Sequence, residues 1–146
     1  MHTEFLPCIA PPLYNRFSME RKSKTKEIGD LGEKHVAALL KKQGFRIIGR
    51  NVRLSYKEID IIAEDEKYIL FVEVKTRSTD KQNYFRPADA VNARKQQNLL
   101  AAAAMYIRSH LKEDQSAKIP RIDVAEVYVA EGKIQRVNYI PRAVTR

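Results

Sequence analysis

The spacing of apolar residues predicts two helices. Over residues 30–43, apolar side chains recur every three to four positions, which is the helical period. Asp30 suits the N-cap of this helix, and Gly44 suits its C-terminal end. An alanine-rich segment over residues 88–111 predicts a second helix, which Pro87 can start. The apolar positions of the first helix are Leu31, Val36, Leu39 and Leu40.

Shorter apolar runs between turn residues predict strands. Residues 58–64 and 68–77 read as a hairpin around a polar turn, in which Asp65 and Glu66 would form a two-residue loop. Gly49 suggests a bulge in the strand before the hairpin. Further strands are predicted over residues 45–54, 121–129 and 133–140, the last two separated by a turn at Gly132. The order is helix, three strands, helix, two strands, which favours one α/β domain with a mixed sheet flanked by helices.

The N-terminal residues differ from the rest of the chain. Residues 1–18 are proline-rich and lack a helical period or a secretory signal pattern. We expect residues 1–27 to be a disordered tail and residues 28–146 to be the folded domain. Met19 opens a plausible start of its own, so residues 1–18 are either part of the tail or an upstream start assigned in error.

Composition narrows the functional class. The 146 residues are enough to form one hydrophobic core. The sequence contains no run of 18 apolar residues, so no membrane-spanning helix is predicted. The single cysteine, Cys8, excludes an intrachain disulfide and a cysteine-rich zinc site, which fits a reducing cytoplasm. The net charge of +9 favours a polyanionic partner, nucleic acid before an anionic membrane surface. A merely basic surface is the alternative.

Four charged residues interrupt the apolar hairpin. Glu58 and Asp60 share one face of their strand, and Glu73 and Lys75 share a face of the next, because side chains alternate along a strand. The two-residue turn would place Glu58 opposite Glu73 and Asp60 opposite Phe71. All four charges would then lie on one face of the sheet.

Such a cluster of acids needs compensating positive charge. Burying an unpaired ion costs several kcal/mol, and one lysine does not balance three carboxylates. Carboxylates are ligands that Mg²⁺, Mn²⁺ and Ca²⁺ prefer, and a metal held this way can activate water for phosphodiester cleavage. Salt bridges on a half-exposed sheet are the alternative. The joint spacing, E-x-D followed by E-x-K on an apolar strand, favours the metal site.

Four motifs carry a resemblance to a known superfamily. They are "GDLGE" at 29–33, "EID" at 58–60, "FVEVK" at 71–75 and "RIDV" at 121–124. In this order they resemble the PD-(D/E)XK nuclease superfamily. Within it, residues 28–141 resemble the YraN family of small bacterial proteins, which is related to archaeal Holliday-junction resolvases. The resemblance implies a restriction-endonuclease-like fold with an α-β-β-β-α-β core.

The resemblance also implies roles for individual residues. Asp60 and Glu73 would bind Mg²⁺ or Mn²⁺ with the Val74 carbonyl, and Lys75 would position or activate the attacking water. Glu33 would add a metal or water contact. The expected activity is hydrolysis of DNA, with branched or repair intermediates as candidate substrates. A homodimer is expected by analogy, since resolvases make two symmetric cuts.

Two positions leave an alternative open. Glu33 lies three residues after Asp30, so the two residues also fit a capping box. Lys57 stands where the family usually has glycine. If that glycine needs a positive φ, lysine would strain the start of the strand and put the position of Glu58 in doubt; otherwise the backbone would change little.

Several basic residues are candidates for nucleic-acid contacts. Lys95 lies on an apolar stripe of the second helix, where it either snorkels or contacts a phosphate. Arg77 and Arg86 would extend a basic rim. The neighbouring aromatics, Tyr84 and Phe85, either stack on bases or anchor their loop.

Two other functional classes compete with the nuclease. One is a non-catalytic nucleic-acid-binding module that retains the fold, and the other is an interaction protein whose basic face meets an acidic partner or a membrane. Neither explains clustered acids on a protein that would face a polyanion. Arg121 and Asp123 of "RIDV" are interpreted as a structural pair.

Overall fold

The computed structural model describes residues 13–79 and 93–144. Two long helices and five strands follow one another in the predicted order, with a short 3₁₀ helix, η2 (Glu113–Gln115), before β4. The bounds are α1 Leu13–Lys42, β1 Arg46–Leu54, β2 Lys57–Glu64, β3 Tyr68–Ser78, α2 Ala93–His110, β4 Ile119–Ala130 and β5 Lys133–Val144.

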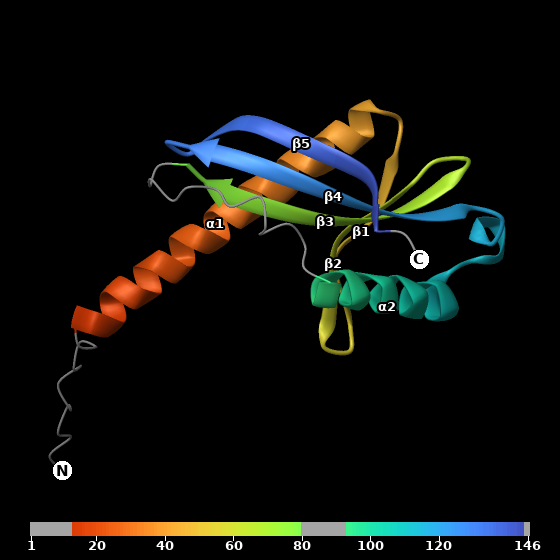
Figure 1. The fold of residues 1–146 in the computed structure, drawn as a ribbon, viewed down its shortest axis with the longest axis horizontal. Coiled ribbons are helices and arrows are strands. Elements are labelled where there is room, and N and C mark those ends of the chain that lie inside the picture. Colours follow the sequence, from red (N-terminus) through yellow and green to blue (C-terminus); the bar gives the residue numbers. More distant parts are fainter. Residues whose placement is uncertain (1–12, 80–92, 145–146) are drawn as a thin grey trace, which may run out of the picture.

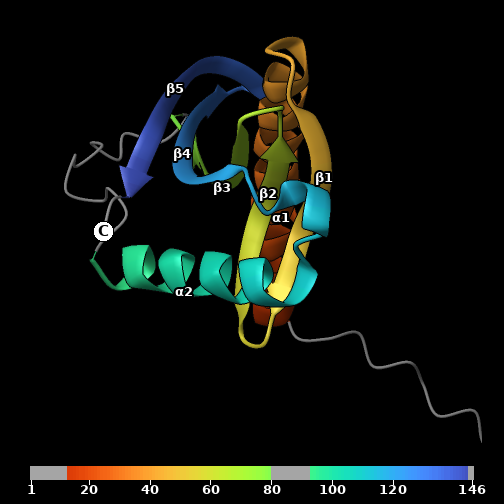
Figure 2. The same cartoon turned by 90° about the vertical axis from the view of Figure 1, so that its right-hand side faces the viewer.

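The five strands form one mixed sheet in the order β1-β2-β3-β4-β5. β3 and β4 run parallel, and the other neighbouring pairs are antiparallel. α1 packs on one face and α2 on the other (Figure 1, Figure 2). This mixed α/β architecture confirms the expected fold class and is consistent with a restriction-endonuclease-like core. Neither helix of the described part has the length and apolar character that a membrane span requires.

Both faces of the central strands are buried, which explains why β2 and β3 read as nearly continuous apolar runs. On the α1 side, Ile61 and Val72 pack under Val36 and Leu40. On the α2 side, Ile62 and Phe71 pack under Leu99 and the alanines of the helix. The alanines at this contact are Ala102 and Ala103.

The first helix is longer than its sequence pattern predicted. It begins at Leu13, so the expected start at Asp30 is wrong, and residues 13–27 of the expected tail are helical. The segment before Asp30 is rich in lysine, arginine and glutamate, which favour helix, and no proline interrupts it. The expected end is confirmed, because Gly44 has a φ of 93° and Phe45 N donates to Leu40 O at 3.0 Å. The division into domains stays a prediction.

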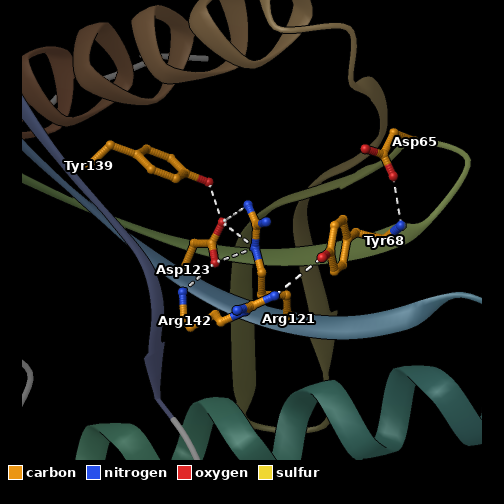
Figure 3. Close-up of polar contacts among 6 residues, drawn as sticks. All are labelled: Asp65, Tyr68, Arg121, Asp123, Tyr139 and Arg142. Atoms are coloured by element: carbon orange, nitrogen blue, oxygen red, sulfur yellow. Dashed lines mark hydrogen bonds and ion pairs between the residues drawn. The ribbon is translucent and has the colours of Figure 1, made fainter.

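The hairpin turn also differs from the prediction. Ile62 pairs with Phe71 and Glu64 pairs with Ile69, so a two-residue loop at Asp65 and Glu66 is wrong. The Asp65 carboxylate accepts hydrogen bonds from the backbone N–H groups of the next strand's start, which stabilises a longer turn (Figure 3). The register shifts by two residues, and a shift of two keeps every side chain on its predicted face.

Two predicted glycine positions are confirmed. The pairing of β1 with β2 is irregular between Ile47 and Gly49, where a bulge was expected. A side chain at Gly49 would meet Val52 Cγ2 at 2.8 Å. Gly132 forms the turn between β4 and β5 with a φ of 70°.

Asp123 is fully buried at the centre of a polar network (Figure 3). The Arg121 guanidinium donates to both of its carboxylate oxygens, with Nη2 at 2.8 Å from Oδ2. From β5, the Tyr139 hydroxyl donates at 2.6 Å and the Arg142 N–H at 2.9 Å. The structural interpretation of the Arg121–Asp123 pair is confirmed, and the network joins β4 to β5.

Candidate functional site

The candidate site lies where β2 and β3 stop pairing. Their last paired residues toward the site are Ile61 and Val72. Immediately beyond, the Val74 N–H donates to Asp60 Oδ2 at 2.8 Å. A side chain thus replaces the missing strand partner, and this hydrogen bond holds the Asp60 carboxylate against β3.

Glu58 does not join this arrangement as the predicted register required. It pairs with Arg53 of β1, whose Nε lies 3.2 Å from Glu58 Oε2, and its side chain is 40% exposed. Its expected position opposite Glu73 is therefore wrong. The observed register brings Asp60 toward Glu73 instead.

Glu73 and Lys75 share a face of β3 with Phe71, as the alternation predicted. Their side chains form an ion pair, with Glu73 Oε1 2.8 Å from Lys75 Nζ, and both are mostly buried. Burial is the largest single influence and lowers the pKa of Lys75, but the hydrogen bonds to Glu73 and Lys95 and the charges of Glu73 and Asp60 together raise it above its ordinary value. General-base catalysis by Lys75 would require a lowered pKa, which a bound cation nearby could produce.

Asp60 carries the most perturbed carboxyl group of this cluster. Burial, followed by the charge of Glu73, raises the pKa of Asp60 to about 7. The Val74 N–H and the charge of Lys75 lower the pKa but do not offset that rise. The charged form of Asp60 is therefore disfavoured by its surroundings, and a bound cation would favour it.

Glu33 reaches the same cluster from α1. Its side chain is 16% exposed, its Oε2 lies 3.8 Å from Arg50 Nη2, and its charge adds to the raised pKa of Asp60. The same Oε2 is buried without a hydrogen-bond partner among the described residues. Burial raises the pKa of Glu33 as well. The capping-box alternative is wrong, because Asp30 lies inside α1 and is no N-cap.

Close packing brings α1 to this position. A Cβ atom at Gly32 would lie 2.0 Å from Thr76 Oγ1, so the helix backbone lies directly against β3 beside the site. Only glycine permits this approach, which explains the glycine before Glu33.

Three cations border the carboxylates. Lys95 of α2 is exposed, and its hydrogen bond to Lys75 and that residue's charge lower the pKa of Lys95. The charge of Arg77 lowers it further. The structure thus brings Lys75, Arg77 and Lys95 together, which favours the rim position over a snorkelling lysine. Arg86, Tyr84 and Phe85 lie outside the described residues.

The ligand set suits a partly hydrated metal ion. Within residues 13–79 and 93–144, no three His, Cys, Asp or Glu side chains form a metal-binding group. An all-protein cage is therefore not present there, but Mg²⁺ is usually bound by one or two carboxylates, with water and substrate phosphate completing its shell. Asp60 and Glu73 supply two carboxylates. The Val74 carbonyl projects to the same strand edge as its N–H, toward Asp60.

The departure at Lys57 is accommodated without strain. Lys57 is not among the described non-glycine residues with positive φ, which are Asn51, Ser55, Glu131 and Arg142. Its ammonium lies 3.8 Å from the centroid of the Tyr56 ring. The glycine usual at this position is therefore not required by the backbone here.

Other polar features lie away from this cluster. Glu64, the last residue of β2, is 3% exposed and binds Arg46, Lys118 and Gln115, the lysine at 3.1 Å. It borders an open cavity of about 600 Å³. The sequence pattern missed this network, because its members are far apart along the chain. A second cavity of about 500 Å³ lies between α2 and β4, and neither is lined by the site carboxylates.

Comparison with known proteins gives a consistent family. The profile described as uncharacterised protein family UPF0102 matches residues 32–127. A UPF0102 protein of Caldanaerobacter subterraneus subsp. tengcongensis is 39% identical over 126 residues, 84% of this chain and 98% of the relative. One from Alkaliphilus metalliredigens is 42% identical over 82% and 98% of the two chains. One from Clostridioides difficile is 41% identical, and the match covers 81% of this chain and 96% of the relative.

Proposed function

The chain belongs to the uncharacterised protein family UPF0102, and from its own residues we propose that it is a divalent-metal-dependent nuclease that hydrolyses phosphodiester bonds in DNA. One observation carries the proposal. The Asp60 carboxylate is held by the Val74 N–H beside Glu73 and Lys75, at the point where two buried strands separate.

The resemblance to the YraN family and the PD-(D/E)XK superfamily supports the same activity. It rests on the "GDLGE", "EID", "FVEVK" and "RIDV" motifs, and the mixed sheet with a helix on each face is compatible with it. By the same resemblance, branched or repair intermediates are the proposed substrates and a homodimer is the proposed assembly. The family names carry no activity, so the chemistry must be argued from the site.

The proposed ligands are Asp60, Glu73 and the Val74 carbonyl, and Glu33 would add a metal or water contact. A bound Mg²⁺ or Mn²⁺ would lower the pKa of a water and neutralise charge on the phosphate. The buried Oε2 of Glu33, which has no hydrogen-bond partner among the described residues, can accept a hydrogen bond from the attacking water and so orient it.

The cations have a separate task. Lys75 is protonated in its pair with Glu73 and can donate a hydrogen bond to water or to a phosphate oxygen. Lys95 and Arg77 stand beside it and suit the flanking phosphates. The three cations would place the scissile phosphate next to the carboxylates, and Arg86 is proposed to extend this rim.

The alternative is a non-catalytic nucleic-acid-binding module. The cations around Lys95 favour it, since binding by charge needs only such residues. The buried acids count against it, because carboxylates beside a phosphate weaken binding unless a cation lies between them.

Incubation with labelled DNA tests the proposal. Linear, single-stranded and four-way-junction DNA would be incubated with Mg²⁺, Mn²⁺ or EDTA, using the wild type and the variants Asp60→Asn and Lys75→Met. Matched controls are Asp114→Asn and Lys133→Met, which change exposed residues of the same type. We expect metal-dependent cleavage that falls at least about 100-fold in both site variants and stays unchanged in the controls.

Two results would contradict the proposal. Binding without cleavage in every metal would favour the non-catalytic module. Cleavage that survives both site substitutions would remove Asp60 and Lys75 from the reaction.

A further inference from the structure

The N-terminal half of α1 extends past the sheet (Figure 1). Residues 22–27 of this helix are all exposed, whereas Val36 and Leu40 of the same helix are fully buried against the sheet. One continuous helix therefore has a packed half and a projecting half. The projecting half precedes residue 32, where the match to the family profile begins.

Charges on the projecting half are divided between two helical faces. Each residue of an α-helix turns by about 100°, so Lys22, Lys26 and Glu33 lie within about 40° of one another around the axis. Leu40 lies on the same stripe, which faces the sheet. The helix stripe that contains Glu33 therefore also contains Lys22 and Lys26 in the projecting half.

On the opposite face of the projecting half, two acids outnumber one lysine. Glu20, Lys24 and Glu27 lie together there, so the acids neighbour Lys24 at helical spacing. Lys22 and Lys26 have no acid on their own stripe between residues 20 and 27. Uncompensated positive charge therefore lies on the side of the projecting half that is continuous with the sheet-facing stripe of the packed half.

We propose that Lys22 and Lys26 form a phosphate-binding arm, which contacts the backbone of a nucleic acid on the flank of the segment that enters the site. The inference rests on the proposed function, since it uses the same substrate. At a rise of 1.5 Å per residue, Lys26 lies about 10 Å and Lys22 about 16 Å from Glu33 along the helix. The two lysines are about 6 Å apart, close to two nucleotide steps of one strand.

This placement explains why a basic helix overhangs an acidic site. A nucleic acid that approaches Asp60 and Glu73 meets repulsion unless nearby cations compensate it. Lysines about two to three helical turns beyond Glu33 supply attraction without entering the site. They would strengthen binding of any sequence, because phosphate contacts carry no base information.

The test measures binding of a labelled DNA duplex of about 30 base pairs by fluorescence anisotropy, in EDTA, over a range of salt concentrations. The variant Lys22→Gln/Lys26→Gln is compared with Lys24→Gln/Lys34→Gln, which removes the same charge from exposed positions at least about 80° around the helix axis from Lys22 and Lys26. Far-UV circular dichroism verifies that both variants fold. Each lost phosphate contact lowers the slope of log K against log salt by about 0.9.

We expect Lys22→Gln/Lys26→Gln to lower the slope by about 1.8 and to weaken binding at least about tenfold at low salt. We expect Lys24→Gln/Lys34→Gln to change the affinity by less than about twofold. Equal losses in the two variants, or no binding by the wild type, would overturn the arm.

The same variants separate the arm from the nuclease proposal. A wild type that binds DNA but never cleaves it contradicts the proposed hydrolysis. The comparison of salt slopes between the two variants would still show whether Lys22 and Lys26 contact phosphates. A wild type that cleaves, with Lys22→Gln/Lys26→Gln binding as tightly as the control variant, retains the nuclease and overturns the arm.

Discussion

Asp60 is placed by one backbone hydrogen bond and destabilised as an anion by what surrounds it. The Val74 N–H favours its charged form. Burial and the charge of Glu73 favour the neutral form more strongly, so the pKa of Asp60 is raised. Its residue type and its strand face could be predicted from the E-x-D spacing. Its bond to Val74 could not, because that contact exists only where β2 and β3 separate.

The raised pKa of Asp60 predicts a pH-dependent stability. In the unfolded chain Asp60 has a pKa near 3.8, and in the folded protein the pKa is about 7. The folded state therefore binds more protons between these values, so the free energy of unfolding contributed by Asp60 falls as pH rises from about 4 to about 7. Asp60→Asn removes this loss while its amide oxygen can still accept from Val74.

Urea unfolding in EDTA at several pH values checks this. We expect Asp60→Asn to match the wild type near pH 4 and to exceed its free energy of unfolding at pH 8 by about 1 to 4 kcal/mol. Asp114→Asn, at an exposed position, should show no such trend. A difference that stays constant with pH would mean that Asp60 does not titrate as described.

Lys95 gives a second prediction at the scale of a single residue. Its hydrogen bond to Lys75 and that residue's charge lower the pKa of Lys95. Lys75→Met should therefore raise the pKa of Lys95, which an NMR titration of the lysine Nζ or Cε signals measures. Lys118→Met, which changes a lysine paired with Glu64, is the control and should leave it unchanged. An unchanged value in Lys75→Met would place Lys95 away from the site.

At the scale of the element, the order of helices and strands was predictable and the contacts between them only in part. The helix-like and strand-like periods located both helices and all five strands. The start of α1 was not predictable from Asp30, because an N-cap residue is also tolerated inside a helix when strong helix formers precede it. The β2–β3 register depended on how the Asp65 side chain satisfies the turn, which sequence spacing leaves open.

Gly32 tests how closely α1 must approach β3. A Cβ at Gly32 would lie 2.0 Å from Thr76 Oγ1, whereas a Cβ at Gly29 would meet nothing within 4 Å. We expect Gly32→Ala to lower the free energy of unfolding by about 1 to 3 kcal/mol through overpacking. Gly29→Ala should raise it by about 0.5 to 1 kcal/mol, because alanine favours a helix interior.

Chemical denaturation of both variants measures these effects. The double variant Gly32→Ala/Thr76→Ala should recover part of the loss, because it removes the clashing hydroxyl. Gly32→Ala should also reduce cleavage, since a displaced helix moves Glu33. Equal stabilisation by both glycine substitutions would mean that the close approach is absent in solution.

At the scale of the whole molecule, the sheet depends on a polar network whose partners lie far apart along the chain. Arg121 and Asp123 are two residues apart, so their pairing could be inferred from "RIDV" alone. Tyr139 and Arg142 reach Asp123 only because β5 folds back on β4. The same strand order places β3, which carries Glu73 and Lys75 of the candidate site, beside β4, which carries Arg121 and Asp123. The network and the candidate site therefore lie on neighbouring strands but have no residue in common.

Asp123→Asn tests whether this network stabilises the fold independently of the site. The substitution leaves the Arg121 guanidinium facing a neutral amide in a buried position, and removing one partner of a buried pair costs about 3 to 5 kcal/mol. We expect a loss of that size in chemical denaturation and faster amide exchange in β5, whose end the network holds.

Glu126→Gln, a half-buried change on the same strand, should cost less than about 1 kcal/mol. Below its unfolding transition, Asp123→Asn should keep the metal-dependent cleavage of the wild type, because the hydrogen bonds described for the Asp123 carboxylate go to Arg121, Tyr139 and Arg142 and not to the site residues. A variant that is fully folded yet inactive would show that the network also positions the site.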